Sequence, residues 1–350
     1  MKKLVCILSI LISFSLIGLS GFTPEEKIKL VKLELVRKFP LEEQEVFFKT
    51  TPKIALDSSG NVYAMDNMQH TFFKFDRYGN FLKKIGRRGQ GPGELEFPFL
   101  ISLGENKVFI SDNKGISIFD LDGKFINGFR KFRFTRSMAV FKDKVLLSES
   151  NTNNLIAVYS HSGKKLNSFG EIYKINYSIL TDWQRYRVEN VINWGEIVCS
   201  NNYIFFVSAL FGDIYKYDSN GNLIKKKRIK NIDFLEDNKK FYFKTTTIKK
   251  WRNKSLPLRL YFQSAVYFEN KIYLLLIDKN IYGEIWKLDK DKLEVEKKYS
   301  FFNFRETLPT QIRSRNIGIN KRNDDNILNF YISFISEGEH FINVYTSKMK

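Results

Sequence analysis

A short phrase that recurs along the chain, first at intervals of 44 and 40 residues and later at 58 and 71, is the feature of this sequence that most constrains its fold. Each copy is an apolar segment ending in an aromatic residue and Asp or Ser, followed by a turn that closes on Gly and a second segment. Because Gly accepts positive φ, this arrangement indicates a tight turn between two antiparallel strands. The copies are Phe75-Asp76…Gly79, Phe119-Asp120…Gly123, Tyr159-Ser160…Gly163 and Tyr217-Asp218…Gly221, with a degenerate copy that lacks the glycine at Leu288-Asp289.

The spacing of the copies predicts a β-propeller. The first three are separated by about 40 residues, the usual length of a propeller blade of four strands. Blade one shows all four segments with strand character, at 52–56, 62–65, 71–75 and 81–85. Similar segments predict blade two at about 99–134, blade three at 135–170, blade four at 188–230 and blade five at 258–300.

The sixth blade has too few strands at the C-terminal end of the sequence. Only 327–335 and 340–346 have strand character there, whereas 29–38 alternates like a strand and precedes blade one. An open ring would leave unpaired strand edges, which proteins avoid. We therefore predict an all-β, six-bladed β-propeller that is closed by an N-terminal strand joining the last blade.

Three stretches in the first part of the chain carry a resemblance. The connector GRRGQGPGELEFP, the turn and strand DSSGNVYAMD and the hairpin FKFDRYGNFLKKIG resemble those of NHL-type six-bladed propellers, over residues 51–125. The resemblance implies the fold, which serves enzymes, sensors and scaffolds alike. Gly91 and Gly93 in the connector are expected to adopt backbone conformations that side chains resist.

The same connector is similar to that of propeller amidating lyases. In those enzymes a metal-binding histidine directly follows the proline, whereas this chain has Phe99 at that position. The chain thus departs from that family where its metal site requires a ligand.

Residues 1–20 have the pattern of a secretory signal peptide. Lys2 and Lys3 precede an apolar run, and the small residues around Ser20 suit a signal peptidase, so cleavage is expected after Ser20. An uncleaved membrane anchor is the alternative, but the run is shorter than a bilayer span of about 20 residues. The sequence predicts an exported protein, periplasmic or extracellular, with residues 21–350 as a single propeller domain.

Composition limits the chemistry of the mature chain. Cys199 is its one cysteine, so no internal disulfide is expected, and a buried apolar role is expected for the thiol. No two of the three histidines, His70, His161 and His340, have metal-ligand spacing, so no metal and no cofactor are expected. The net charge of +19 suits an anionic partner, or lysines that solvate exposed strands. Nucleic acid is not expected as a partner, because no binding motif is present.

Strand direction decides which loops share a face of the ring. The tight turns occupy one face, and the second-to-third loops and the blade connectors occupy the other. Three long insertions, at about 171–190, 231–257 and 301–315, fall in connectors, so we name the second face the insertion face. Insertions that accumulate where they do no harm are the alternative. The candidate ligand-binding residues on this face are His70, Arg87, Arg88, Trp183, Arg185, Arg187, Trp251 and Arg252.

Aromatic faces stack on sugars, and arginines pair with anions. We therefore expect a monomeric ligand-binding or protein-interaction scaffold for an anionic glycan or a protein surface. Simple packing of these aromatics on the blades is the alternative. A hydrolase or lyase acting on a sugar or peptide at the channel mouth is the competing function, which would require three or more carboxylates or histidines to converge there. No catalytic residue is predicted, and Asp66 and Asp112 are expected to stabilise blades through hydrogen bonds.

Overall fold

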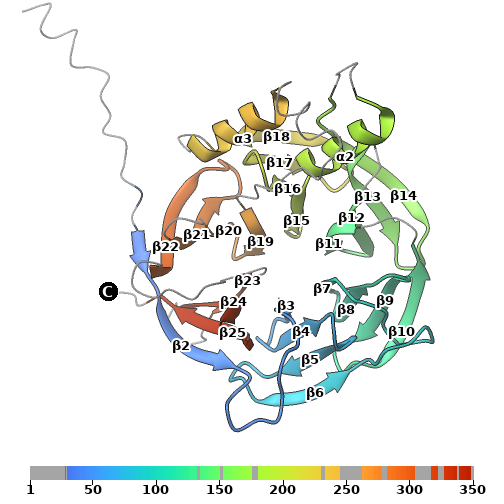
Figure 1. The fold of residues 1–350 in the computed structure, drawn as a ribbon, viewed down its shortest axis with the longest axis vertical. Helices are drawn as coiled ribbons and strands as arrows, with labels where there is room; N and C mark the ends of the chain where they lie inside the picture. Colours follow the sequence, from blue (N-terminus) through green and yellow to red (C-terminus); the bar gives the residue numbers. More distant parts are fainter. Residues whose placement is uncertain are drawn as a thin grey trace, which may run out of the picture.

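Six β-sheets form the blades of a ring around a central axis in this computed structural model (Figure 1), which confirms the six-bladed β-propeller. Every sheet is antiparallel apart from the pairing of one short N-terminal strand. The structure describes residue 28 and residues 30–131, 135–149, 153–175, 180–229, 233–244, 262–277, 282–303, 317–321, 327–336 and 339–347.

In blades one to five the chain runs through the strands in sequence order, from one side of the sheet to the other. Blades one and two consist of β3 (Lys53–Leu56), β4 (Val62–Asp66), β5 (Thr71–Phe75) and β6 (Phe81–Ile85), then β7 (Leu100–Gly104), β8 (Lys107–Ser111), β9 (Gly115–Asp120) and β10 (Phe125–Arg130). Blades three and four consist of β11 (Thr135–Phe141), β12 (Lys144–Glu149), β13 (Asn154–Ser160) and β14 (Lys165–Glu171), then β15 (Gly195–Cys199), β16 (Ile204–Ser208), β17 (Asp213–Tyr217) and β18 (Leu223–Arg228). Blade five contains β19 (Phe262–Phe268), β20 (Lys271–Ile277), β21 (Tyr282–Asp289) and β22 (Val295–Asn303).

The two ends of the described chain meet in blade six and close the ring. This blade contains β23 (Ile317–Lys321), β24 (Leu328–Ser336), β25 (Glu339–Thr346) and, at its outer edge, β2 (Glu34–Phe39). Strands β2 and β25 are antiparallel, with Glu34 opposite Thr346 and Phe39 opposite Ile342. The predicted closure by an N-terminal strand is therefore confirmed.

Two details of the closure differ from the prediction. The predicted segment 29–38 divides, because β1 (Leu30–Lys32) pairs in parallel with β22 of blade five instead of joining the C-terminal strands. The C-terminal part also supplies a third strand, β23, which sequence reasoning missed. The N-terminal segment therefore joins two neighbouring blades.

The tight turns form as predicted. The Asp76 carboxylate accepts hydrogen bonds from the backbone amides of Tyr78 and Asn80, at 2.8 and 2.9 Å, and Gly79 adopts a φ of +94°. In the connector after blade one, Gly93 has a φ of +75°, but Gly91 lies outside the left-handed region. The expectation of a constrained backbone is thus confirmed for Gly93 and wrong for Gly91.

Asp66 and Asp112 stabilise their blades through hydrogen bonds, as predicted. Asp66 is fully buried and accepts hydrogen bonds from the Lys49 amide at 2.5 Å and the Thr50 hydroxyl at 3.0 Å. Asp112 accepts hydrogen bonds from the backbone amides of Glu96 and Gly115, at 2.9 and 3.0 Å. Each carboxylate thus ties the segment before its blade to the end of the second strand.

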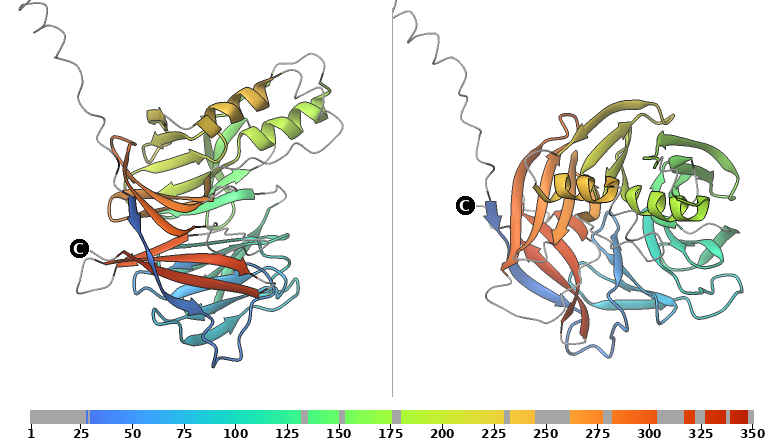
Figure 2. Two further views of the ribbon diagram at one scale, coloured as in Figure 1. Left: turned by 60° about the vertical axis from the view of Figure 1, so that its left-hand side comes forward. Right: turned by 45° about the horizontal axis from the view of Figure 1, so that its top comes forward.

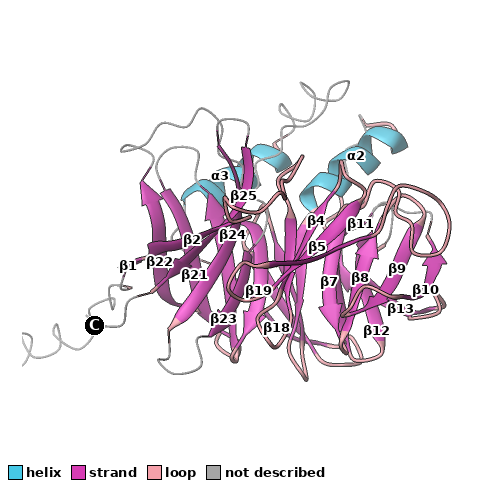
Figure 3. Cartoon of the chain, turned by 90° about the horizontal axis from the view of Figure 1, so that it is seen from below, coloured by secondary structure: helices cyan, strands magenta, loops and turns pink. Residues whose placement is uncertain are grey.

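Two of the three insertions contain helices that were not predicted, α2 (Asp182–Ile192) and α3 (Asp233–Phe243). Both project from the same face of the ring (Figures 2 and 3). They share one buried cluster, in which Val188 and Ile192 of α2 and Tyr242 of α3 join Leu210 and Phe211 of the β16–β17 loop. Blade four consequently begins after α2, later than predicted. The third insertion lies almost entirely outside the described residues.

None of the helices in the described part of the chain is long and apolar enough to cross a membrane. The predicted signal peptide, residues 1–20, lies outside the described residues.

Candidate functional site

The candidate binding residues predicted in and after blade one, His70, Arg87 and Arg88, each contact the connector that follows this blade. His70 is buried, and its Nδ1 accepts a hydrogen bond from the Phe97 amide at 3.0 Å while its ring contacts that of Phe97. Arg87 is exposed and pairs with Glu94 at 2.9 Å. The Gly91 amide and Arg87 together lower the pKa of Glu94. Arg88 is also exposed, and its backbone forms a bridge with Leu95. His70 therefore helps to hold the connector, and none of these residues lines the groove described below.

The other described candidates lie together on helix α2. Arg187 stacks on Trp183, with its Cζ 4.5 Å from the ring centroid, and Trp183 remains 60% exposed. Arg185 pairs with Asp182 at 3.2 Å. The helix begins at a capping box in which the Thr181 hydroxyl accepts a hydrogen bond from the Gln184 amide. Trp251 and Arg252 lie outside the described residues.

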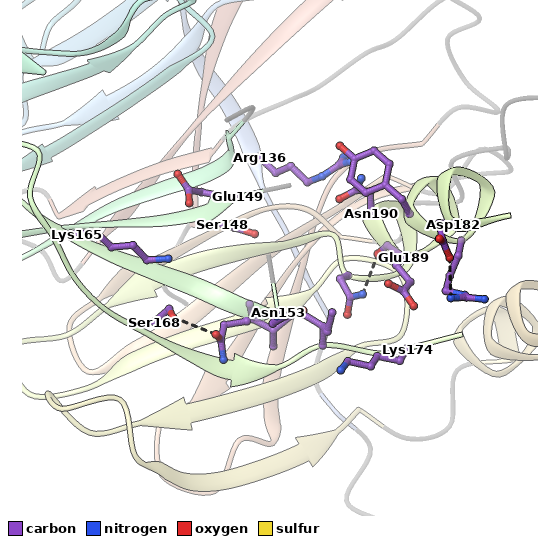
Figure 4. Close-up of a pocket in the computed structure, with 16 residues that line it drawn as sticks. Arg136, Ser148, Glu149, Asn153, Lys165, Ser168, Lys174, Asp182, Glu189 and Asn190 are labelled. Atoms are coloured by element: carbon purple, nitrogen blue, oxygen red, sulfur yellow. Dashed lines mark hydrogen bonds and ion pairs between the residues drawn. The ribbon is translucent and has the colours of Figure 1, made fainter. Parts of the chain in front are cut away.

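A polar groove of about 510 Å³ separates helix α2 from blade three (Figure 4). Its lining combines four cations with hydroxyl and amide side chains. The cations are Arg136, Lys165, Lys174 and Arg185; the carboxylates are Glu149, Asp182 and Glu189; and the neutral polar residues are Ser148, Asn153, Asn154, Ser168, Tyr186, Asn190 and Asn193. Of the predicted residues, only Arg185 lines this groove.

The carboxylates of the groove are engaged within the protein. Glu149 accepts hydrogen bonds from the Tyr159 hydroxyl, at 3.1 and 3.0 Å, and lies 3.7 Å from the ammonium of Lys131. Glu189 accepts a hydrogen bond from the Ile175 amide at 2.9 Å. With Asp182 paired to Arg185, none of the three is without a partner.

Two lysines of the groove, Lys165 and Lys174, are exposed and make no ion pair with any residue that the structure describes. Figure 4 shows Lys165 at the left of the view and Lys174 at the lower right, with Asn153 between them. With four cations against three carboxylates, the lining carries one more positive than negative charge, beside amide and hydroxyl groups. This combination suits a hydroxyl-rich anion.

Arg136 of β11 is held against Trp194, which follows helix α2. Its Cζ lies 4.3 Å from the Trp194 ring centroid, within the range of a cation–π contact. Burial lowers the pKa of Arg136, and Tyr186 opposes this shift. Hydrogen bonds between backbone groups link Trp194 to Val191 and Ala209, and its side chain packs against the buried cluster that α2 and α3 share.

The innermost strands of the six blades line a channel of about 550 Å³ that reaches the tight turns at Asp57 and Gly60. In its wall Glu196 accepts a hydrogen bond from the Ser137 hydroxyl at 2.9 Å. Burial raises the pKa of Glu196, and the positive charge of Lys53 opposes this shift. Asp57 and Glu196 are the carboxylates of the described lining, which includes no histidine, so it falls short of the cluster that the competing enzymatic function requires.

Cys199 lies in the same channel wall and is partly buried. Burial raises the pKa of its thiol well above the ordinary value, which suits the predicted role of a small apolar side chain. No group of three or more side chains suited to a metal ion occurs among the described residues.

A third cavity, of about 310 Å³, lies where the channel approaches the insertion face. It is lined by Thr50, Thr51, Lys53, Met65, Asn67, Pro98, Phe99, Leu100, Thr135, Arg136 and Trp194. We call it the mouth. Phe99, at the position where amidating lyases carry a histidine, is part of this lining.

The cations that line the groove and the mouth were missed by sequence reasoning, apart from Arg185. Arg136 and Trp194 belong to different blades, so no local motif connects them. Lys165 and Lys174 resemble the many other lysines of the chain. The bias toward the insertion face was the one sequence signal that pointed to this region.

Comparisons with known proteins identify the fold. No protein-family model matches the sequence, and no curated protein matches it. Among solved structures, the chain is similar to a predicted exported protein from Bacteroides fragilis, with a TM-score of 0.54 and 13% identity over 92% of this chain and 100% of the other. It is also similar to a catalytically inactive virginiamycin B lyase from Staphylococcus aureus solved with quinupristin, with a TM-score of 0.50 and 12% identity over 91% of this chain and 100% of the lyase. The likeness is one of fold: this chain has the architecture of bacterial six-bladed β-propellers.

Proposed function

We propose that this chain is an exported propeller of the NHL type that binds an acidic glycan in the groove between helix α2 and blade three. The observation that carries the proposal is the lining of the groove, in which Lys165 and Lys174 stand beside amide and hydroxyl groups while the carboxylates are engaged internally. Amides and hydroxyls exchange hydrogen bonds with sugar hydroxyls, and the cations attract the acidic groups.

The size and shape of the groove support a small or chain-like ligand. Its volume of about 510 Å³ lies within the range of ordinary ligand pockets, about 300–1,000 Å³. Trp183, exposed on the same helix, adds an aromatic surface on which a sugar ring can stack. A six-bladed ring supplies a rigid support for such a site.

Binding of polygalacturonic acid, with neutral dextran as a comparison, tests the proposal by isothermal titration calorimetry. The double variant K165E/K174E should weaken binding by about tenfold or more, because it reverses both unpaired charges of the groove. The matched control is K124E/K292E, which makes the same charge change at exposed lysines in the turns of blades two and five.

The control variant distinguishes binding in the groove from a general electrostatic attraction between the basic protein and the acidic polymer. Affinity of K124E/K292E within about twofold of the wild type would support the groove, since distant charges are largely screened at physiological salt. Equal losses in both double variants would show that net charge alone attracts the polymer, and the proposal would be wrong. Binding of dextran as strong as that of the polyuronate would also contradict it.

Export is tested separately. Mass spectrometry of protein recovered outside the cytoplasm should give a chain that begins at Gly21, after removal of residues 1–20. A recovered chain that still contains Met1 or Lys2 would contradict cleavage.

A further inference from the structure

The groove, the mouth and the channel are neighbouring cavities. Arg136 lines both the groove and the mouth, and Lys53 and Leu100 line both the mouth and the channel. The three cavities therefore follow one another from the outside of blade three to the axis of the ring. A cation lines each shared wall. Arg136 lies between the groove and the mouth, and Lys53 lies between the mouth and the channel.

The geometry at Arg136, between the groove and the mouth, suits an oxyanion. The Arg136 guanidinium stacks on the ring of Trp194, and Figure 4 shows its side chain extending toward helix α2. A guanidinium presents two parallel N–H donors to a carboxylate or sulfate, and stacking on an aromatic ring orients that fork. A lysine at this position would offer a point charge without the planar geometry.

The mouth beyond Arg136 is suited to hydroxyl groups. Thr50, Thr51 and Asn67 line it with polar groups, and Phe99 contributes an aromatic ring. The Thr50 hydroxyl already donates to Asp66 at 3.0 Å and the Asn67 amide to the Pro98 carbonyl at 2.7 Å, so these side chains offer a ligand their remaining acceptor sites. The Thr51 hydroxyl is within 3.1 Å of Nδ1 of His340. This lining matches a sugar unit without its own charge, or the uncharged side of an acidic unit.

We propose that groove and mouth form one extended site, in which an acidic oligosaccharide places a carboxylate or sulfate on Arg136 and its next unit in the mouth. This inference rests on the proposed function and deepens it, because it makes chain length and the Arg136 fork the basis of selectivity. A single acidic sugar fills the cavity on only one side of Arg136. A chain of several units contacts both sides and is bound more tightly.

The test compares oligogalacturonides of one, two and four units, and a sulfated oligosaccharide series of the same lengths, by calorimetry on the full protein. In at least one series the four-unit ligand should bind at least about tenfold more tightly than the single unit. Arg136→Lys should remove most of this gain while the melting temperature changes little. The series that shows the gain identifies the oxyanion as carboxylate or sulfate.

A variant that fills the mouth separates the two halves of the site. Thr51→Tyr should reduce the affinity for four units to about that of the single unit, because the larger side chain fills the mouth. Equal affinity for all lengths in both series, with loss of binding in K165E/K174E, would overturn the extended site and leave the proposed function standing. Absence of binding in both series would overturn the extended site and the proposed function together.

Discussion

A Cβ atom added to Gly79 would lie 2.5 Å from Cε1 of Phe39, because the tight turn of blade one rests directly on strand β2. The same relationship recurs around the ring between a turn glycine and the outer strand of the preceding blade: Gly123 with Ile85, Gly163 with Phe129, and Gly221 with Phe169. Strand β2 therefore occupies the place in blade six that β6, β10 and β14 occupy in their own blades. The N-terminal strand is thus a full member of the repeat.

Removal of β2 should open the ring. A chain that starts at Thr51 loses Phe39 and Phe48, both buried, and uncovers the edge of β25. Loss of the two aromatic side chains alone should lower the free energy of unfolding by about 3 kcal/mol or more. Thermal unfolding and size-exclusion chromatography should show a lower melting temperature and association through the exposed edge.

A chain that starts at Leu33 is the matched control for this truncation. It removes β1 and keeps β2 with its pairing to β25. Its melting temperature should stay near that of the full mature chain. If the two truncated chains were equally stable and both monomeric, closure by β2 would contribute nothing.

The sequence predicted the ring because its signals are local and repeated. Asp76 and Gly79 define one turn, and the same pair of residue types returns at each later blade. Helix α2 carries few buried side chains, Val188 and Ile192, so its apolar periodicity is weak. The capping box at Thr181 and Gln184 was the available signal for this helix.

The two connector glycines should respond differently to a side chain. Gly93 has a φ of +75°, and a Cβ there would lie 3.2 Å from Cβ of Phe125, so Gly93→Val should destabilise the protein by about 1–3 kcal/mol. At Gly91 an added Cβ would approach only the flexible side chain of Glu94, at 3.1 Å. Gly91→Val should therefore cost much less in chemical denaturation. Equal losses in the two variants would contradict the assignment of strain to Gly93.

A pH-dependent ion pair links blades four and five. The buried Lys216 lies 2.5 Å from Asp291, and this contact, with Lys290, lowers the pKa of Asp291. A carboxylate whose folded pKa is lowered stabilises the fold above its unfolded pKa of about 3.9, and this contribution is lost as the pH falls through the folded value. The melting-temperature difference between wild type and Asp291→Asn should be largest near about pH 6 and shrink below about pH 4. A difference that does not vary with pH would exclude the ion pair as its source.

The groove was harder to predict than the ring, for a physical reason. Its lining comes from β11, the end of β12, the start of β13, β14 with the segment after it, and helix α2, which are separate parts of the sequence. Arg136 stacks on Trp194, which is far away in the sequence, so no local pattern indicates that Arg136 lines a site. His70 shows that a rare residue on a loop can have a structural contact that the sequence does not indicate, because its ring accepts a hydrogen bond from the Phe97 amide.

The connector that carries Lys174 to the groove is tied to blade four by a buried charge cluster. Asp213, 1% exposed, accepts hydrogen bonds from Arg228 at 2.6 and 2.8 Å and a further one from the Tyr173 hydroxyl. These contacts raise the pKa of Arg228, and burial with the Asp213 contact raises the pKa of Tyr173 to about 12. The arrangement fixes the residue next to Lys174 against a rigid strand.

Asp213→Asn should release that connector. The amide cannot match the charge of Arg228, which keeps partial access to water, so we expect a loss of about 2–3 kcal/mol in the free energy of unfolding. The control Asp182→Asn removes an exposed carboxylate paired with Arg185 and should change stability by about 0.5 kcal/mol or less. Hydrogen exchange should accelerate in residues 172–175 of Asp213→Asn well before global unfolding, because their anchor to blade four is weakened. Unchanged exchange there, together with a loss of stability no larger than that of Asp182→Asn, would show that the cluster does not hold the connector.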